Sequence, residues 1–424
     1  MTTTRTRKTV LLVGATGVFG GRLAQHLCRD FTGIDLVVTS RNEARAQHLA
    51  AALAVTAAIP VKGVAFDTGG DLAAQLGALK PWAVIDCTGP FQTADYRLAE
   101  AAIASRAHII DLADAEAYLT GYREHLHGLA KAAGVLAIAG ASSTPGLSGA
   151  VIAAICDDWQ GIDDIDMAIV PGGRSAVGQS VIEAVLSYAG QPVTVYRNGT
   201  LDVETGWRQG HEIDLPGLGR RRVALVETAD AALLNRRYSI TGSIRFHAGL
   251  EATVEQRGME ALAWLRHRHL LGDVARLVPW LQKARGLTRL VTGDRGGMMV
   301  DVHGRDAAGI ARHARWTLVA ADDDGSYVPV MATAAALALL LDAPPAAGAW
   351  LAGDLLPLDA IEAQMTGYAI TTALEIWAGD TAEGRELERA AGGRLRRFGK
   401  AKLKPFLFGQ PGGDQPVTHP DIVP

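Results

Sequence analysis

A short stretch with three glycines near the start of the chain constrains the fold more than any other feature. Its seven residues are Gly14, Ala15, Thr16, Gly17, Val18, Phe19 and Gly20. They follow the apolar run 9–13 and precede an amphipathic segment, so the glycines lie where a buried strand turns into a helix. Such a turn binds a nucleotide pyrophosphate at the helix N-terminus. Glycines at a strand-to-helix turn can also serve packing alone, and this spacing is GxxGxxG rather than GxGxxG, so the surrounding pattern must decide.

That pattern is a regular alternation of strands and helices over residues 1–146. Strands are predicted at 9–13, 35–39, 61–66, 83–87, 108–111 and 135–139, and helices at 18–29, 43–53, 71–79, 95–105 and 118–133. The strands are continuously apolar, which is typical of a parallel sheet covered on both faces. We therefore predict an α/β fold whose first domain, 1–146, is a doubly wound Rossmann sheet.

A different pattern begins after residue 146. Thr144 is placed to cap a helix that starts at Pro145 and runs to about residue 157. Further strands are predicted at 165–170, 221–226, 298–303 and 312–320, with a hairpin at 193–203 and helices at 179–189 and 259–270. We interpret 147–330 as an α+β domain built on a mostly antiparallel sheet.

The C-terminal part divides into two segments. Residues 331–383 are predicted to be helices, and the uniformly apolar helix that ends near residue 341 is expected to pack back against the first domain. Residues 384–424 form a basic tail rich in Gly and Pro, a composition that commonly lacks a packed core.

Composition and charge exclude several classes of protein. The net charge of −4 and the 20% of charged residues are unlike those of a nucleic-acid binder. The longest apolar run is far shorter than a membrane span, and glycine ends the N-terminal apolar run after five residues, so we expect no membrane partner and no signal peptide. Three cysteines without metal or redox spacing favour a reducing, cytoplasmic compartment. A homodimer is compatible with the sequence, which does not fix the oligomeric state.

The end of the second predicted strand indicates the cofactor. NAD-binding folds place an acid here to hold the ribose hydroxyls. This chain has Ser40, Arg41 and Asn42 instead. A hydroxyl and a guanidinium can bind a 2′-phosphate that a carboxylate would repel, so the sequence favours NADP(H). In the alternative interpretation Arg41 only begins the next helix.

A second loop is expected beside the cofactor. It follows the fourth strand and contains Thr88, Gly89, Pro90 and Phe91. In an open α/β sheet, ligands bind beyond the carboxyl ends of the strands where the strand order reverses. The loop should therefore flank the cofactor next to the glycine turn.

These elements together resemble the saccharopine dehydrogenase-like NADP-binding oxidoreductases. The resemblance rests on the glycine turn, Ser40 to Asn42, the loop Cys87 to Phe91, and the segment 108–112 with Glu116 behind it. It implies a Rossmann domain, a nicotinamide cofactor and a second domain that closes over the substrate. The family is similar to opine-type amine dehydrogenases, polyamine-forming enzymes and enoyl reductases, so it implies the substrate only loosely. No substrate-binding signature matches beyond residue 150.

Other enzyme classes with a similar glycine turn require residues that this chain lacks. An extended short-chain dehydrogenase needs a tyrosine followed four positions later by lysine, and none of the eight tyrosines has one. A non-catalytic NADP-binding regulator stays open. The pairs His125/His127 and His267/His269 lack a third ligand at helical spacing, so no metal site is expected. No HExxH, Walker loop or GxSxG element occurs.

Candidates for catalysis come from two loops. Ser142 and Ser143 leave the last strand and could hold a substrate carboxylate, although capping is an equal alternative. Arg174 could bind a carboxylate bidentately or be an ordinary polar loop residue. Asp111 and Glu116 could transfer protons or, in the alternative interpretation, cap and orient the loop, and Tyr238 and His247 are weaker candidates. Our sequence hypothesis is hydride transfer to or from a C=N or C=C bond of a small, carboxylated metabolite.

Overall fold

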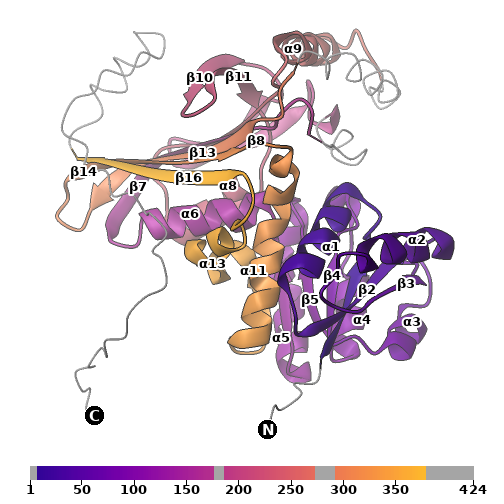
Figure 1. The fold of residues 1–424 in the computed structure, drawn as a ribbon. Helices are drawn as coiled ribbons and strands as arrows, with labels where there is room; N and C mark the ends of the chain where they lie inside the picture. Colours follow the sequence, from indigo (N-terminus) through magenta and orange to yellow (C-terminus); the bar gives the residue numbers. More distant parts are fainter. Residues whose placement is uncertain (1–6, 176–185, 273–291, 379–424) are drawn as a thin grey trace, which may run out of the picture.

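The computed structural model of the protein describes residues 7–175, 186–272 and 292–378. Within them the chain forms two sheets, each with its own helices (Figure 1). The predicted helix 179–189 lies mostly outside the described residues, and the basic tail 384–424 lies wholly outside them.

The first sheet is parallel, with seven strands in the order β15-β6-β5-β4-β1-β2-β3. Its strands are β1 (Lys8–Val13), β2 (Ile34–Ser40), β3 (Val61–Ala65), β4 (Ala83–Asp86), β5 (His108–Asp111), β6 (Leu136–Ala139) and β15 (Gly348–Leu351). Its helices are α1 (Val18–Asp30), α2 (Glu43–Ala54), α3 (Leu72–Leu79), α4 (Arg97–Ala104) and α5 (Glu116–Ala133). The apolar strands β4 and β6 are buried along their whole length, as the continuous hydrophobic pattern predicts. The Rossmann prediction is confirmed.

The second sheet is mixed and mostly antiparallel, as predicted. Its main path is β10-β11-β12-β7-β13-β14-β16, and β8 joins β12 to β9. The strands are β7 (Trp159–Val170), β8 (Pro192–Arg197), β9 (Thr200–Thr205), β10 (His211–Leu215), β11 (Gly219–Leu225), β12 (Ile244–Gly249), β13 (Gly296–Asp306), β14 (Ala311–Ala320) and β16 (Ile370–Ala378). The predicted hairpin turn has positive φ at both Asn198 and Gly199, as a tight two-residue turn requires.

Two strands correct the prediction that residues 331–383 are helical. β15 adds a parallel edge strand beside β6, and β16 adds an antiparallel edge strand beside β14. β15 has only four residues, too few to show a period. The strand prediction also missed β10 and β12, whose charged residues interrupt the apolar pattern.

Most of the remaining helices lie between the two sheets, whereas α9 (Thr253–His267) packs on the second sheet alone (Figure 1). The others are α6 (Ser148–Ile155), α8 (Asp230–Tyr238), α11 (Val328–Asp342), α12 (Ala352–Leu355) and α13 (Leu358–Ala363). α6, α11 and α13 lie beneath the second sheet, and α11 runs down beside the first domain (Figure 1). The segment Asp324–Asp342 is long and apolar enough to cross a membrane, a test that a buried core helix also passes. Here most of its apolar window is buried in the protein, where α11 packs on α1 and α13.

Candidate active site

The glycine turn has the geometry that a pyrophosphate needs. Gly14 adopts φ +78°, and a Cβ on it would lie 2.9 Å from the carbonyl carbon of Cys87 on the neighbouring strand end. A Cβ on Gly20 would lie 2.3 Å from the carbonyl oxygen of Gly14, so only glycine lets α1 pack this closely. Gly17 precedes α1, and no side chain caps the helix there. The first N–H groups of α1 are therefore available to an anion.

At the end of β2, Ser40 and Asn42 form local hydrogen bonds, whereas the side chain of Arg41 is exposed. Asn42 caps α2, because its side-chain oxygen accepts a hydrogen bond from the Arg45 N–H at 3.1 Å. The Ser40 hydroxyl oxygen accepts one from the Asn42 N–H at 3.2 Å. Arg41 is exposed and forms no ion pair with any residue in the described part of the chain. Asn42 thus holds the local backbone, while the exposed Arg41 is the residue for which we predict contact with a 2′-phosphate.

The loop after β4 is held by a buried carboxyl group. Asp86 accepts hydrogen bonds from the backbone N–H of Thr88 at 2.8 Å and from its hydroxyl at 2.5 Å. Burial raises the pKa of Asp86 to about 6, although the hydrogen bonds from Thr88 oppose the rise. Thr88 therefore fixes the loop through its side chain, and Gly89, Pro90 and Phe91 line the cavity described below.

Asp111, at the end of β5, holds the neighbouring loops together. It accepts hydrogen bonds from the N–H groups of Ala113 and Gly140, both at 3.0 Å, and from the Tyr118 hydroxyl at 3.2 Å. Burial raises its pKa to about 7, and the nearby charge of Asp86 adds to the rise. These contacts favour a role for Asp111 in orienting the loop over a role in proton transfer, because its carboxyl oxygens are already engaged in hydrogen bonds.

This raised pKa predicts a stability change with pH. Folded Asp111 keeps its proton up to about pH 7, whereas an unfolded aspartate loses it near 3.8. The folded state therefore binds more protons within this window, and stability falls as pH rises through it, with a slope of up to about 1.4 kcal/mol per pH unit. Asp111→Asn should flatten this fall in urea unfolding curves recorded from pH 4 to 8. An unchanged slope would contradict the assignment.

A cavity of about 1030 Å³ separates the two domains. Its first-domain wall is formed by the strand ends, including Phe19, the loop 89–92 and the loop Ser142 to Thr144. The three hydroxyls of Ser142, Ser143 and Thr144 form no hydrogen bond with any described residue, and Thr144 does not cap a helix as predicted. Instead a wide helical turn, η2 (Ser143–Leu147), precedes α6. The loop therefore offers hydroxyl groups to a ligand.

The second sheet contributes a largely apolar wall. Its side chains come from β7, β12, β13 and β14, from the end of β11 and from the connection between β9 and β10. They include Ile169, Phe246, Met298, Leu318, Val226 and Trp207. A cavity of this size exceeds what one small substrate needs and suits a nicotinamide together with a substrate.

Three acids give the cavity its polarity. Glu116 begins α5 in the first domain, whereas Glu227 follows β11 in the second. Burial raises the pKa of both, and Glu227 raises that of Glu116 further by repulsion. Thr194 donates hydrogen bonds to Glu227 from its N–H and hydroxyl, which oppose the rise there. The third acid, Asp114, faces the cavity, and its enclosure by the walls raises its pKa.

One side chain reaches from the first domain toward the second across the cavity. The amide nitrogen of Gln92 donates to Asp114 at 3.3 Å and lies 3.5 Å from the Tyr188 hydroxyl. Tyr188 and Glu227 were missed by the sequence analysis, because no local motif marks them. Only the packing of the two domains brings them to the cavity.

The other predicted catalytic residues lie elsewhere. Arg174 is exposed, and its N–H donates to the Gly293 carbonyl at 3.0 Å, outside the cavity lining. His247 and Tyr238 do not line the cavity either. Among the described lining residues there is no Lys, Arg or His. In this part of the chain, a substrate carboxylate would meet hydroxyl and N–H groups but no cation.

Comparison with known proteins decides the nature of the first domain. Residues 10–138 match the family model of the saccharopine dehydrogenase NADP binding domain. The chain carries a saccharopine dehydrogenase-type NADP-binding domain. Its cofactor is NADP(H), which agrees with the uncapped α1 and with the absence of an acid after β2. The search of curated proteins found no significant match to this chain.

Solved structures extend the likeness to the second domain. Apo saccharopine dehydrogenase (L-Glu forming) from Saccharomyces cerevisiae matches 87% of this chain and 99% of its own, with 14% identity and a TM-score of 0.59. Amine dehydrogenase from Mycobacterium smegmatis matches 82% of this chain and 95% of its own, with 12% identity and a TM-score of 0.43. The first match shows a shared two-domain fold. Within that fold the chain has an NADP-binding domain of the saccharopine dehydrogenase type, as the dehydrogenase-family match shows.

Arg41 should set the preference of this domain for NADPH over NADH. Arg41→Ala should weaken NADPH binding by about 10–100-fold, because one charge-assisted contact to the 2′-phosphate is lost. NADH binding should stay unchanged, which fluorescence titration of both cofactors will show. Arg45→Ala, one turn into α2, is the matched control. Tighter binding of NADH than NADPH by the natural protein would contradict the assignment.

Proposed function

We propose that the protein transfers hydride between NADP(H) and the C=N bond of a small imine or amine. The observation that carries the proposal is the carboxyl pair Glu116 and Glu227, which face one cavity from opposite domains. Burial raises the pKa of both carboxyl groups, and the charge of Glu227 raises the pKa of Glu116 further, so ionisation of one group disfavours ionisation of the other. One carboxyl group is then an acid and the other a negative charge.

These two states match what imine reduction requires. The nicotinamide, when bound, supplies the hydride that forms the new C–H bond. The protonated carboxyl group gives its proton to the imine nitrogen, and the ionised one stabilises the resulting iminium cation. The apolar wall of the second sheet excludes water from the reacting carbon. In the opposite direction the same pair accepts the proton of the amine.

The charges of the cavity also bear on the substrate. The sequence hypothesis named a carboxylated metabolite with a C=N or C=C bond. The described lining instead offers three acids, the hydroxyls of Ser142 to Thr144 and no cation. We therefore favour an amine with an apolar body over an amino acid, because a carboxylate would be repelled. An apolar enoyl substrate with a C=C bond is the second candidate, supported by the Trp207 and Phe246 wall.

A substrate panel tests this proposal. NADP⁺ reduction would be followed by absorbance with apolar primary and secondary amines, with α-amino acids, and in reverse with imines and enoyl esters. The proposal expects turnover with amines and imines that lack a carboxylate. Turnover restricted to α-amino acids would refute the proposed substrate class, and turnover of enoyl esters alone would favour the second candidate. NADPH binding without turnover of any class would favour a non-catalytic regulator.

A further inference from the structure

A group of acidic and histidine side chains lies on the face of the second sheet that points away from the cavity. Along β13, Met298, Val300 and Val302 belong to the core that faces the first domain. Side chains alternate along a strand, so Asp301 and His303 point to the opposite face. Met298 lines the active-site cavity, and the group of Asp301 and His303 is therefore separated from that cavity by the thickness of the sheet.

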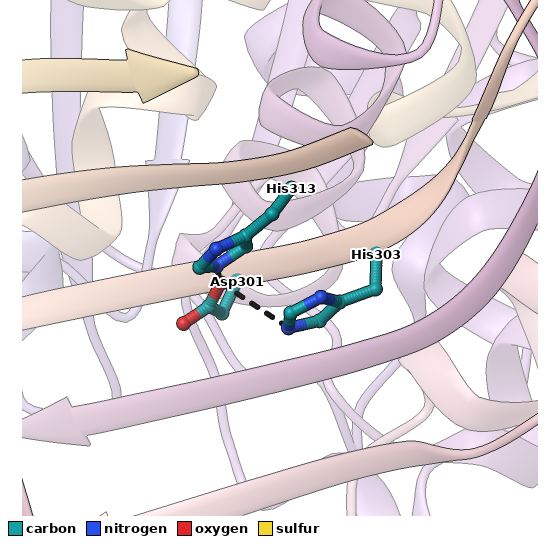
Figure 2. Close-up of side chains that lie close together, drawn as sticks. All are labelled: Asp301, His303 and His313. Carbon is teal, nitrogen blue, oxygen red and sulfur yellow. Dashed lines mark hydrogen bonds and ion pairs between the residues drawn. The ribbon is translucent and has the colours of Figure 1, made fainter. Parts of the chain in front are cut away.

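Strand register brings a third residue to this group. His303 pairs with His313 across the β13–β14 ladder, and Asp301 pairs with Arg315. Asp301, His303 and His313 are buried, with exposed fractions of 6%, 8% and 9%. One ligand atom from each lies within 4.8 Å of the others. Figure 2 shows the carboxylate of Asp301 beside the two imidazole rings.

The contacts within the group converge on one carboxylate oxygen. His313 Nε2 contacts Asp301 Oδ1, and His303 Nε2 lies 3.9 Å from the same oxygen (Figure 2). The second oxygen, Oδ2, accepts from Arg315 Nε at 2.9 Å. Arg315 thus orients the carboxylate and leaves Oδ1 turned toward the two histidines.

We propose that Asp301, His303 and His313 bind one divalent transition-metal ion such as Zn²⁺. Two imidazole nitrogens and one carboxylate oxygen are a ligand set that this ion uses in proteins. The two imidazole rings are stacked with their centroids 4.1 Å apart. For a ring nitrogen of each histidine to bind the same ion, one ring has to turn about its Cβ–Cγ bond. Asp164 pairs with His303 in the β7–β13 register and adds negative charge nearby.

The site would act on structure rather than on hydride transfer. An ion held by β13 and β14 ties together two strands that also carry the cavity residues Met298 and Leu318 on their other face. Binding to the folded state alone stabilises it by mass action. The site would therefore stiffen the wall against which the substrate lies.

Cobalt binding to the untagged, chelator-treated full chain tests the proposal. Co²⁺ serves as the probe because its visible absorption reports nitrogen and oxygen ligands, and Zn²⁺ should displace it. We expect one equivalent of Co²⁺ per chain and a rise in Tm on adding either ion. His303→Asn and His313→Asn should each weaken binding by at least about tenfold, the loss expected for removing one ligand contact. NADPH titration and circular dichroism confirm that each variant is folded.

Two controls separate this site from adventitious binding. His247→Asn changes another buried histidine of the second sheet, and its Co²⁺ affinity should equal that of the natural protein. The double variant His267→Asn/His269→Asn removes an exposed pair and should also bind normally. Binding that survives in His303→Asn but disappears in the double variant would overturn the proposal. So would a natural protein that binds no ion at equimolar concentration.

Discussion

Glu227→Gln is expected to lower the rate of hydride transfer by about 10²–10⁴-fold, the usual contribution of a positioned acid or base. Glutamine keeps the size of the side chain and can still accept hydrogen bonds from Thr194, but it carries neither the charge nor the exchangeable proton. Glu116→Gln should have an effect of the same order, because the proposed step uses both carboxyl groups, one as the acid and the other as the negative charge. NADPH affinity should change little in either variant.

The pH profile distinguishes this role from a structural one. In the direction of reduction, kcat should fall as pH rises through the raised pKa of the carboxyl pair, since the acid form is then lost. Both glutamine variants should lose that limb of the profile. Glu375→Gln, an exposed change on β16 away from the cavity, is the control and should keep normal turnover. Full activity of Glu227→Gln with an unaltered pH profile would show that the carboxyl pair is not the proton source.

Gly20→Ala is expected to lower the free energy of unfolding by about 1–3 kcal/mol, the usual cost of overpacking a tight contact. The added Cβ would lie 2.3 Å from the Gly14 carbonyl oxygen, which belongs to the backbone of the phosphate-binding turn. The turn must therefore shift, which displaces the backbone groups that contact the pyrophosphate. NADPH binding should weaken by at least about tenfold, which corresponds to a loss of about 1.4 kcal/mol in binding free energy.

The neighbouring glycine supplies a matched control. A Cβ on Gly21 would meet the Ala15 carbonyl oxygen at 3.6 Å, an ordinary contact. Gly21→Ala should therefore stabilise the protein, by up to about 1 kcal/mol, because alanine favours the helix. Chemical unfolding and NADPH titration of both variants give the comparison. Equal stability of the two variants would mean that α1 does not pack against the turn as described.

The first domain could be predicted closely because its signals are local. The strand-turn-helix pattern around Gly14 to Gly20, the missing acid after β2 and the loop at Gly89 each lie within a few residues. All the strands of the parallel sheet except β15 were placed within about two residues, a usual error for element boundaries. β15 comes from the far end of the chain and completes the sheet only through tertiary packing.

The second-domain residues of the cavity and the group of Asp301, His303 and His313 could not be predicted from local sequence patterns. Glu227 and Tyr188 reach the cavity only when the second domain packs on the first. His303 and His313 become neighbours through the register of β13 and β14, which the sequence spacing of either residue does not reveal. For the same reason Arg174, an attractive loop cation by sequence, lies outside the cavity lining.

The central claim is hydride transfer from NADPH to a C=N carbon in the cavity between the domains. The most direct measurement uses NADPH deuterated at C4 together with an apolar imine, followed by mass spectrometry of the product amine. We predict deuterium on the carbon that was doubly bonded to nitrogen, and a much lower yield with Glu227→Gln. NADPH that binds tightly yet stays unoxidised with every imine tested, or a product amine without deuterium, would contradict this claim.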